Sequence, residues 1–260
     1  MANYWPLDGF FRATLTRSSS MINRSIVPVV LLHAFPLDAR MWDAQVSFLD
    51  RAGYETIAPN LPGREPDNDL ARWATRILEL LPDSFIPVGC SMGGYLTFEL
   101  WRQAPGRIPA LVFADTRAGA DTPEVRQGRE DTILLLGEDG FDPFWKAQEP
   151  KLFSPEAPSD VVERARTIAS EQPITNLVAT LQALGARLDS RETVGEIGVP
   201  ALVLVGEHDQ LTPPSESEAI AQALPQGRLV VIPGAGHLTP LEKPEEFNEE
   251  LTLFLASVSP

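Results

Sequence analysis

The chain has 260 residues, of which 43% are hydrophobic and 22% charged, a balance typical of a folded globular protein. Its net charge of −15 is opposite to the positive charge that nucleic-acid binders carry, and no apolar run reaches the ~20 residues of a membrane-spanning helix. One cysteine, Cys90, excludes an internal disulfide and a cysteine-cluster metal site, and three histidines argue against a histidine-rich metal site.

The first 25 residues differ in composition from the rest of the chain. They hold three arginines but only one acidic residue, Asp8, and they lack the apolar stretch of a secretory signal. We expect residues 1–25 to be a loosely ordered or non-native extension, with Met21 as an internal start; a transit-like or interaction tail is the alternative. We expect the protein to be cytoplasmic.

Six short apolar runs predict strands, and longer segments with apolar residues every three to four positions predict helices. The runs are continuous rather than alternating, as is typical of parallel strands covered on both faces. The predicted strands lie in residues 26–34, 54–59, 85–90, 110–115, 201–207 and 228–234, and the predicted helices in 38–53, 68–81, 92–104, 214–224 and 244–256. This alternation predicts an α/β fold around a mostly parallel sheet.

Residues 117–190 interrupt this alternation. They offer no convincing strand and contain helical segments separated by prolines, at 122–140, 142–153, 159–172 and 175–188. We expect a helical cap, inserted after the strand that ends near Asp115 and lying over the carboxyl edge of the sheet. The α/β core would then consist of residues 26–116 and 191–260.

The stretch VGCSMGGYL, residues 88–96, places Ser91 between Gly89 and Gly93 with G-x-S-x-G spacing. A predicted strand precedes it and a predicted helix follows it, which is the context of a nucleophile elbow: a sharp turn that lifts a serine hydroxyl above the sheet. Small residues at both glycine positions give the turn room. We interpret Ser91 as a catalytic nucleophile rather than as a structural serine in a Gly-rich turn.

A serine hydroxyl needs an adjacent base, and the base needs an orienting acid. His237 lies in a loop between the last predicted strand and the last predicted helix, which places it at the same edge of the sheet as Ser91. Asp209 follows the strand before that. The chain order Ser91, Asp209, His237 is that of the α/β-hydrolase arrangement. Asp115, at the end of LVFAD, is the alternative acid.

Two backbone N–H groups are candidates for holding an oxyanion. Met92 follows the nucleophile at the start of a helix, and Phe35 lies in the loop after an early strand. His33, in the same loop, is expected to brace it through side-chain hydrogen bonds.

The chain resembles the α/β-hydrolase superfamily, in its small capped serine-esterase branch. The motifs HAFPLDARMW, LPGRE, GCSMGG, LVLVGEHDQLTPP and PGAGHLTPLEKPEEF correspond in order to landmarks of that family and span about residues 27–255. The sequence is most similar to enzymes like 3-oxoadipate enol-lactonase and to carboxylesterases. The resemblance implies cofactor-free hydrolysis of a small-molecule ester or lactone, without a metal. The family usually carries His-Gly where this chain has His33-Ala34.

Other functions stay open beside ester or lactone hydrolysis. The same triad serves C–C-bond hydrolases and a lyase-like synthase of the menaquinone pathway, which needs arginines for substrate carboxylates, and Arg117, Arg126 and Arg129 lie near the predicted cap entrance. A cofactor-free perhydrolase side activity is also compatible with the serine. A non-catalytic binding protein is disfavoured because Ser91, Asp209 and His237 are all present.

The substrate pocket is the least specified part of the sequence. Phe144, Trp145 and Phe153 of the cap either line an acyl pocket, together with Arg117, or pack the cap onto the core. Both a monomer and a homodimer fit the sequence, and no nucleic-acid or membrane partner is expected.

Overall fold

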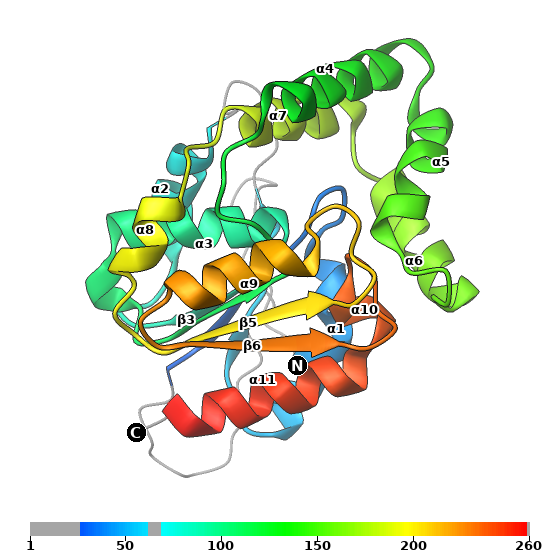
Figure 1. Ribbon diagram of the computed structural model, residues 1–260. Helices are drawn as coiled ribbons and strands as arrows, with labels where there is room; N and C mark the ends of the chain where they lie inside the picture. The colour runs from blue at the N-terminus through cyan, green and yellow to red at the C-terminus, as the bar shows by residue number, and fades with distance from the viewer. Residues whose placement is uncertain (1–26, 62–68, 259–260) are drawn as a thin grey trace.

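A six-stranded, all-parallel sheet forms the centre of the computed structural model, which describes residues 27–61 and 69–258 (Figure 1). The strands pair in the order β2-β1-β3-β4-β5-β6. Their bounds are β1 Val29–Leu32, β2 Thr56–Ile57, β3 Ile86–Cys90, β4 Leu111–Ala114, β5 Ala201–Gly206 and β6 Gly227–Ile232. Five of the six predicted runs contain one of these strands and the sixth, 228–234, overlaps β6, which begins one residue earlier, so the predicted parallel α/β sheet is confirmed.

Helices cover both faces of the sheet. On one face lie α1 (Asp43–Arg51) and α11 (Pro244–Val258), and on the other lie α2 (Leu70–Leu80), α3 (Met92–Gln103) and α9 (Pro214–Ala223). Each lies within a segment whose apolar spacing predicts a helix, except that α11 extends two residues beyond the predicted 244–256. The predicted helix 38–53 consists of a 3₁₀ turn, η1 (Ala39–Trp42), followed by α1. Three short elements were not predicted, because they are too brief to show an apolar period: η2 (Pro105–Arg107), α8 (Arg191–Glu196) and α10 (Thr239–Glu242).

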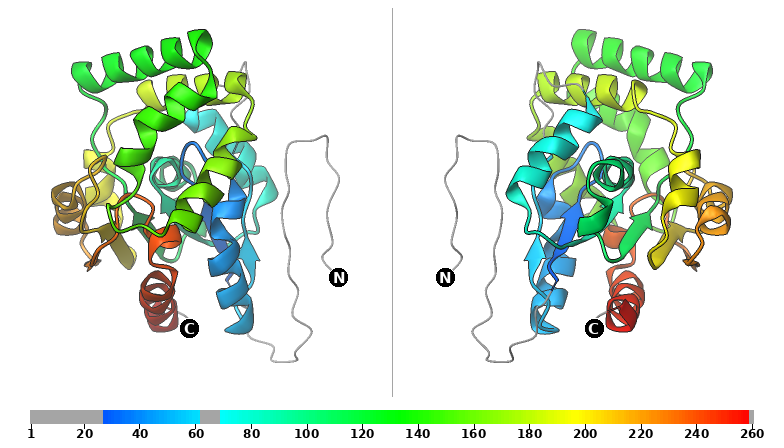
Figure 2. Two further views of the ribbon diagram at one scale, coloured as in Figure 1. Left: turned by 90° about the vertical axis from the view of Figure 1, so that its right-hand side faces the viewer. Right: turned by 90° about the vertical axis from the view of Figure 1, so that its left-hand side faces the viewer.

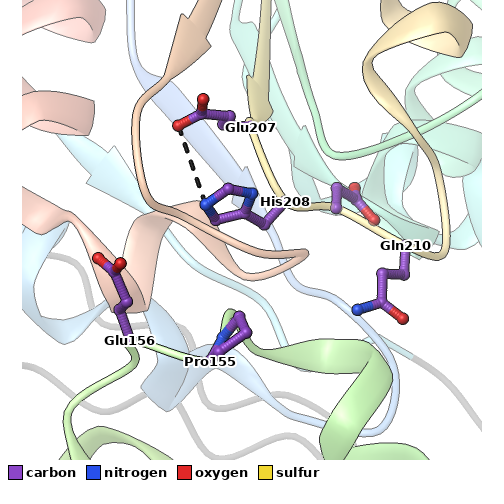
Figure 3. A pocket seen from close by; sticks show the side chains of 6 residues that line it. Pro155, Glu156, Glu207, His208 and Gln210 are labelled. Carbon is purple, nitrogen blue, oxygen red and sulfur yellow. Dashed lines mark ion pairs between the residues drawn. The ribbon is translucent and has the colours of Figure 1, made fainter.

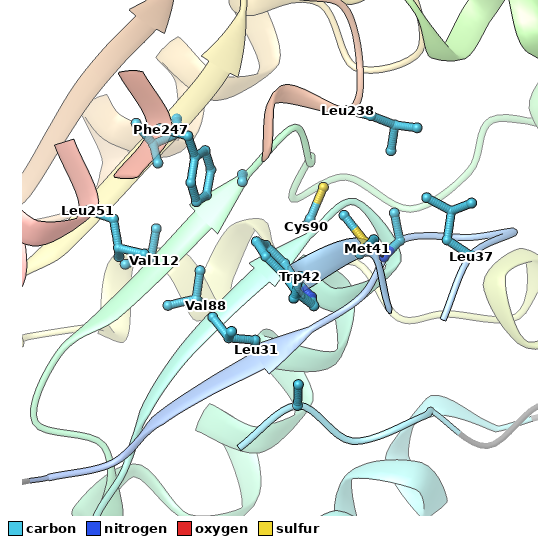
Figure 4. Close-up of a cluster of buried hydrophobic side chains, with 14 of the residues drawn as sticks. Leu31, Leu37, Met41, Trp42, Val88, Cys90, Val112, Leu238, Phe247 and Leu251 are labelled. Carbon is cyan, nitrogen blue, oxygen red and sulfur yellow. Dashed lines mark hydrogen bonds between the residues drawn. The ribbon is translucent and has the colours of Figure 1, made fainter. Parts of the chain in front are cut away.

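The core is divided by the sheet into two halves. Along β1, Val29 and Leu31 belong to the half under α1 and α11, whereas Val30 and Leu32 belong to the half under α2 and α3. This alternation follows from the two-residue period of a strand. Figure 4 shows the first half, in which Trp42 and Phe247 pack on the strands. Because both faces are buried, the strands read as continuous apolar runs in the sequence.

Four helices occupy the chain between β4 and α8. They are α4 (Pro123–Glu138), α5 (Phe141–Leu152), α6 (Ser159–Ser170) and α7 (Ile174–Gly185), and both figures place them on the side of the molecule away from α11 (Figures 1 and 2). They rest on loops that follow the strands' carboxyl ends: Phe144 packs on Phe35 after β1, and the His237 N–H after β6 donates to the Leu152 carbonyl at 3.1 Å.

None of the helices in residues 27–61 and 69–258 is long and apolar enough to cross a membrane. The predicted N-terminal extension lies outside the described residues, as does most of the LPGRE motif.

Candidate active site

Ser91 forms the turn between β3 and α3. Its backbone has φ 52° and ψ −108°, in the left-handed region that residues with a side chain seldom adopt. Hydrogen bonds hold it there: the Ser91 N–H donates to the Ala114 carbonyl at 2.8 Å, and the Thr116 hydroxyl donates to the Ser91 carbonyl at 2.9 Å. Such strain persists only where the surrounding structure fixes it, and it is common at functional sites.

The glycines on either side let α3 lie against the sheet. A Cβ on Gly89 would come within 2.3 Å of the Gly93 carbonyl oxygen, and a Cβ on Gly93 would come within 2.0 Å of the Leu32 carbonyl oxygen. Both contacts are with backbone atoms, which cannot rotate away. The G-x-S-x-G spacing therefore reflects close packing between the turn, the helix and β1.

A continuous row of hydrogen bonds joins Ser91, His237 and Asp209. The Ser91 Oγ lies 2.8 Å from His237 Nε2, and His237 Nδ1 lies 2.9 and 2.8 Å from the two Asp209 carboxylate oxygens. His237 and Asp209 are buried, at 2% and 4% exposure, and Ser91 is partly buried. The parallel sheet causes this meeting, because the loops after β3, β5 and β6 all leave it at one edge.

Asp209 is held in the ionised form by other donors. The backbone N–H groups of Leu211 and Thr212 donate to its Oδ1 at 2.8 and 2.9 Å, and the Thr212 hydroxyl donates to Oδ2 at 2.7 Å. Burial opposes the charge, but His237 and these hydrogen bonds outweigh it, so the pKa of Asp209 is lowered. Thr212 is a part of the site that the sequence analysis did not single out.

The contact with Asp209 raises the pKa of His237. Burial disfavours the imidazolium, but the nearby Asp209 carboxylate, with smaller contributions from Asp115 and Glu242, more than compensates. An imidazole so placed can accept a proton from the Ser91 hydroxyl and keep it transiently.

Asp115, the alternative acid, makes no hydrogen bond to His237 within the described part of the chain. Its carboxyl lies at the end of β4 and is fully buried. Burial first, and the neighbouring Asp209 charge second, raise its pKa to about 8. Its geometry therefore differs from that of Asp209, which contacts the imidazole directly.

The two backbone N–H groups expected to hold an oxyanion donate no hydrogen bond to another described residue. The Ser91 carbonyl accepts the N–H groups of Gly94 and Tyr95, at 2.9 and 3.3 Å, but neither Met92 N–H nor Phe35 N–H has an acceptor among the described residues. Met92 N–H lies at the first turn of α3, where helix N–H groups are free and the helix dipole favours negative charge.

His33 links two loops beside Phe35. Its Nδ1 lies 3.0 Å from the Ala34 carbonyl oxygen, and its Nε2 accepts the Leu61 N–H at 2.8 Å. Burial lowers the pKa of His33 to about 4, so the ring is neutral and can donate at one nitrogen while it accepts at the other. Ala34 adopts no positive φ, so the alanine in place of the family's glycine introduces no backbone strain.

Glu242, on the short helix α10, holds the loop that carries His237. Its carboxylate accepts the N–H groups of Gly236 and Leu238, at 3.0 and 3.4 Å, and that of Ser154 at 2.8 Å. The last bond connects the loop to the chain after α5. The sequence analysis missed Glu242; its signal is a glutamate five residues after the histidine, beside Pro240 and Pro244.

The three aromatic residues expected at the substrate pocket lie in one row of rings. Phe144 contacts Phe35 edge-on at 6.0 Å between ring centroids, while Trp145 stacks on Phe141 at 6.0 Å and meets Phe153 at 6.4 Å. Phe144 also packs with Leu136, Leu177 and Leu181 in an apolar cluster between α4, α5 and α7. Trp145 and Phe153 belong instead to the half of the core under α1 and α11, so they pack the helical segment onto that half.

Arg117 is one of three arginines on a single carboxylate. Asp121, whose side chain is fully buried, accepts from Arg117 at 2.6 Å, Arg129 at 2.6 Å and Arg187 at 2.5 Å. Burial opposes ionisation, but the bonds to Arg129 and Arg187 lower the pKa of Asp121. The cluster joins both ends of the helical segment, and Arg187 lies over the Tyr95 ring at 4.2 Å.

The loop that carries Asp209 lines part of a hollow of about 370 Å³ (Figure 3). Its wall consists of Pro155, Glu156, Glu207, His208, Asp209 and Gln210, and His208 Nε2 lies 4.0 Å from the Glu207 carboxylate. Neither Ser91 nor His237 borders this hollow. No group of three or more acidic, cysteine or histidine side chains in residues 27–61 and 69–258 could hold a metal ion.

Comparison with known proteins gives consistent matches. A model described as "Alpha/beta hydrolase family" matches residues 29–250. Pimeloyl-[acyl-carrier protein] methyl ester esterase of Nitrosomonas europaea is 29% identical over 236 residues, covering 84% of this chain and 92% of that protein. The malate-bound thermophilic esterase from Thermogutta terrifontis has a TM-score of 0.83 and 31% identity, covering 90% of this chain and 91% of that one.

The enol-lactonase from Burkholderia xenovorans LB400 shares the fold, with a TM-score of 0.84 at 23% identity, over 96% of this chain and 100% of that one. The extent of these matches confirms the fold and superfamily that the sequence motifs predicted. The chain therefore belongs to the alpha/beta hydrolase family.

Proposed function

We propose that this protein is a serine hydrolase that cleaves a carboxylic ester or lactone, with Ser91 as nucleophile, His237 as base and Asp209 as orienting acid. One observation carries the proposal: the unbroken row from Ser91 Oγ through the His237 ring to the Asp209 carboxylate, with contacts of 2.8–2.9 Å. Esterases among the relatives support the same class of reaction.

In the first half-reaction, His237 Nε2 takes the Ser91 proton as Ser91 Oγ attacks the carbonyl carbon. The oxyanion then accepts hydrogen bonds from the N–H groups of Phe35 and Met92. His237 returns the proton to the leaving alcohol oxygen as the C–O bond breaks. An acyl-enzyme on Ser91 remains.

In the second half-reaction, water takes the place of the alcohol. His237 removes one water proton, the hydroxide oxygen attacks the acyl carbon, and the proton returns to Ser91 Oγ as the acid departs. Asp209 holds the imidazole in the tautomer with Nδ1 protonated and stabilises the imidazolium in both halves.

The helical segment α4–α7 would act as the cap of this site. Phe144 meets Phe35 in the expected oxyanion loop, and the surrounding leucines form an apolar cluster against which the acyl group of the substrate would lie. The synthase-like alternative is less supported, because Arg117 and Arg129 are both engaged by Asp121.

The test is direct labelling of the nucleophile, together with a substrate panel. A fluorophosphonate should label Ser91 in the parent, and Ser91→Ala should abolish labelling and lower ester turnover by several orders of magnitude with an unchanged circular dichroism spectrum. Ser257→Ala, on the outer helix α11, is the matched control and should keep both. Labelling of another serine would overturn the assignment. p-Nitrophenyl esters of graded chain length, compared with an enol-lactone, would define the acyl group.

A further inference from the structure

The carboxyl of Asp115 contacts three separate segments of the chain. Its Oδ1 accepts the Gly206 N–H at 3.0 Å. Its Oδ2 accepts the Thr239 N–H at 3.2 Å, the Thr239 hydroxyl at 2.6 Å and the Cys90 thiol at 3.8 Å. The side chain is fully buried, and its backbone has φ 47°, so Asp115 and Ser91 are the only described non-glycine residues with positive φ.

Each of these partners lies next to a different member of the proposed triad. Cys90 directly precedes Ser91, Gly206 lies three residues before Asp209, and Thr239 lies two residues after His237. The strand order explains the arrangement: β4 lies between β3 and β5, so Asp115, which directly follows β4, is central to the edge where the three loops meet.

The backbone around Asp115 reinforces the same contacts. The residue before it, Ala114, accepts the Ser91 N–H at 2.8 Å, and the Asp115 N–H donates to the Leu204 carbonyl at 2.9 Å. Asp115 therefore lies where one side chain can fix the relative positions of all three loops.

We propose that Asp115 is a positioning residue of the active site, whose buried carboxyl sets the distances among Ser91, His237 and Asp209 by holding the loop that carries each of them. This inference rests on the proposed function, because it assigns the residue to the same triad. Asp115 acts through Thr239, Gly206 and Cys90, and it touches neither the substrate nor the imidazole.

The protonation of Asp115 fits this role. The ionisable groups that face it are Asp209, His237 and the Cys90 thiol, whose own pKa burial raises. With its pKa raised to about 8, Asp115 is largely neutral at pH 7, and its proton can be shared with the Thr239 hydroxyl. A neutral Asp115 leaves Asp209 as the carboxylate that stabilises the imidazolium.

The test compares three substitutions by their effects on kcat, KM and fluorophosphonate labelling. Asp115→Asn keeps the size of the side chain but replaces one acceptor oxygen with an NH₂ group, which leaves a neighbouring donor without a partner. Thr239→Val removes the hydroxyl at equal shape, and Thr239→Ser keeps it. Since a shift of about 1 Å at a reacting centre lowers rates about 10²-fold, we expect Asp115→Asn to lower kcat and the labelling rate about 10- to 100-fold with KM within about twofold.

Thr239→Val should lower kcat about 10-fold, whereas Thr239→Ser should stay within about twofold of the parent. The Asp115→Asn/Thr239→Val double variant should be little worse than Asp115→Asn alone, because both changes break one shared interaction. Glu99→Gln is the control for a buried carboxyl outside the site, since Glu99 pairs with Arg102 on the far part of α3; it should keep kcat within about twofold.

The proposal is overturned if Asp115→Asn keeps kcat and labelling within about threefold of the parent, or if the effects of Asp115→Asn and Thr239→Val multiply fully in the double variant. A parent protein that labels elsewhere than Ser91 would overturn the proposed function instead. The two failures are therefore distinguishable in one set of measurements.

Discussion

Replacing Gly93 by alanine tests whether helix packing under the nucleophile turn positions Ser91. The new Cβ would lie 2.0 Å from the Leu32 carbonyl oxygen, 2.6 Å from the Leu32 carbonyl carbon and 2.9 Å from the Leu32 Cβ. Real Cβ contacts do not fall below 3.0 Å, so α3 and β1 must separate by 3.0 − 2.0 = 1.0 Å or more. Both elements are buried on all sides, so the separation disturbs packing on each face.

Overpacking of a core lowers the free energy of unfolding by about 1–3 kcal/mol, and we place this change at about 3 kcal/mol because the obstacle is backbone. For a chain of this size that corresponds to a Tm lower by about 6–12 °C. Ser91 lies two residues before Gly93, so the displacement should also lower kcat about 100-fold.

The assay is Tm by circular dichroism and turnover of a p-nitrophenyl ester, measured at least 15 °C below the Tm of the variant. Gly128→Ala is the matched control, because Gly128 lies within α4 and a Cβ there meets nothing within 4 Å. Alanine should stabilise that helix by about 0.5–1 kcal/mol without changing turnover. A Gly93→Ala variant with Tm within 2 °C and kcat within twofold of the parent would refute the argument.

Asp209→Asn should lower kcat/KM about 10³-fold or more, a larger loss than Asp115→Asn causes. It should also move the acid limb of the pH profile of kcat/KM to lower pH, because Asp209 raises the pKa of His237 in the parent. If Asp115→Asn causes the larger loss at equal stability, the orienting acid is Asp115, after β4. In the folded protein Asp115 keeps a proton up to about pH 8 that an unfolded chain loses near pH 3.8, so its contribution to stability falls as pH rises between these values. In urea unfolding, the free energy of unfolding should therefore fall less between pH 5 and pH 8 for Asp115→Asn than for the parent. An equal fall in both proteins would contradict this. Asp121→Ala should lower the free energy of unfolding by about 3–5 kcal/mol, because it leaves three mostly buried guanidiniums without their shared carboxylate. A Tm change under 3 °C would argue against the cluster as a link between the two ends of the helical segment.

The sheet and the main helices could be predicted because each is a single local pattern. Val29, Val30, Leu31 and Leu32 form a continuous apolar run since both faces of β1 are buried, and α2 shows its buried side in Leu70, Trp73, Ala74 and Ile77. The position of Ser91 was equally predictable, because the glycines that allow the turn lie within two residues of it.

The contacts that hold the site together could not be predicted in this way, since they join residues distant in the sequence. Asp115 and Thr239 are 124 residues apart, and Ser154 and Glu242 are 88 apart. A threonine two residues after a histidine carries no local signal of the partner it will meet. Arg187 was missed for the same reason, because only the folded chain brings it to Asp121 and to the Tyr95 ring.

Sequence reasoning treated Asp115 and Asp209 as competitors for one role because both are aspartates that follow strands at one edge of the sheet. The geometry separates them by what each oxygen meets: those of Asp209 face the His237 ring, whereas those of Asp115 face Gly206, Thr239 and Cys90. Two ionised carboxylates this close would repel each other, and the site avoids that by raising the pKa of one and lowering that of the other. An acid that contacts the base and an acid that holds the loops are thus compatible within one buried site, and on this reading the neutrality of Asp115 is a condition for the charge on Asp209.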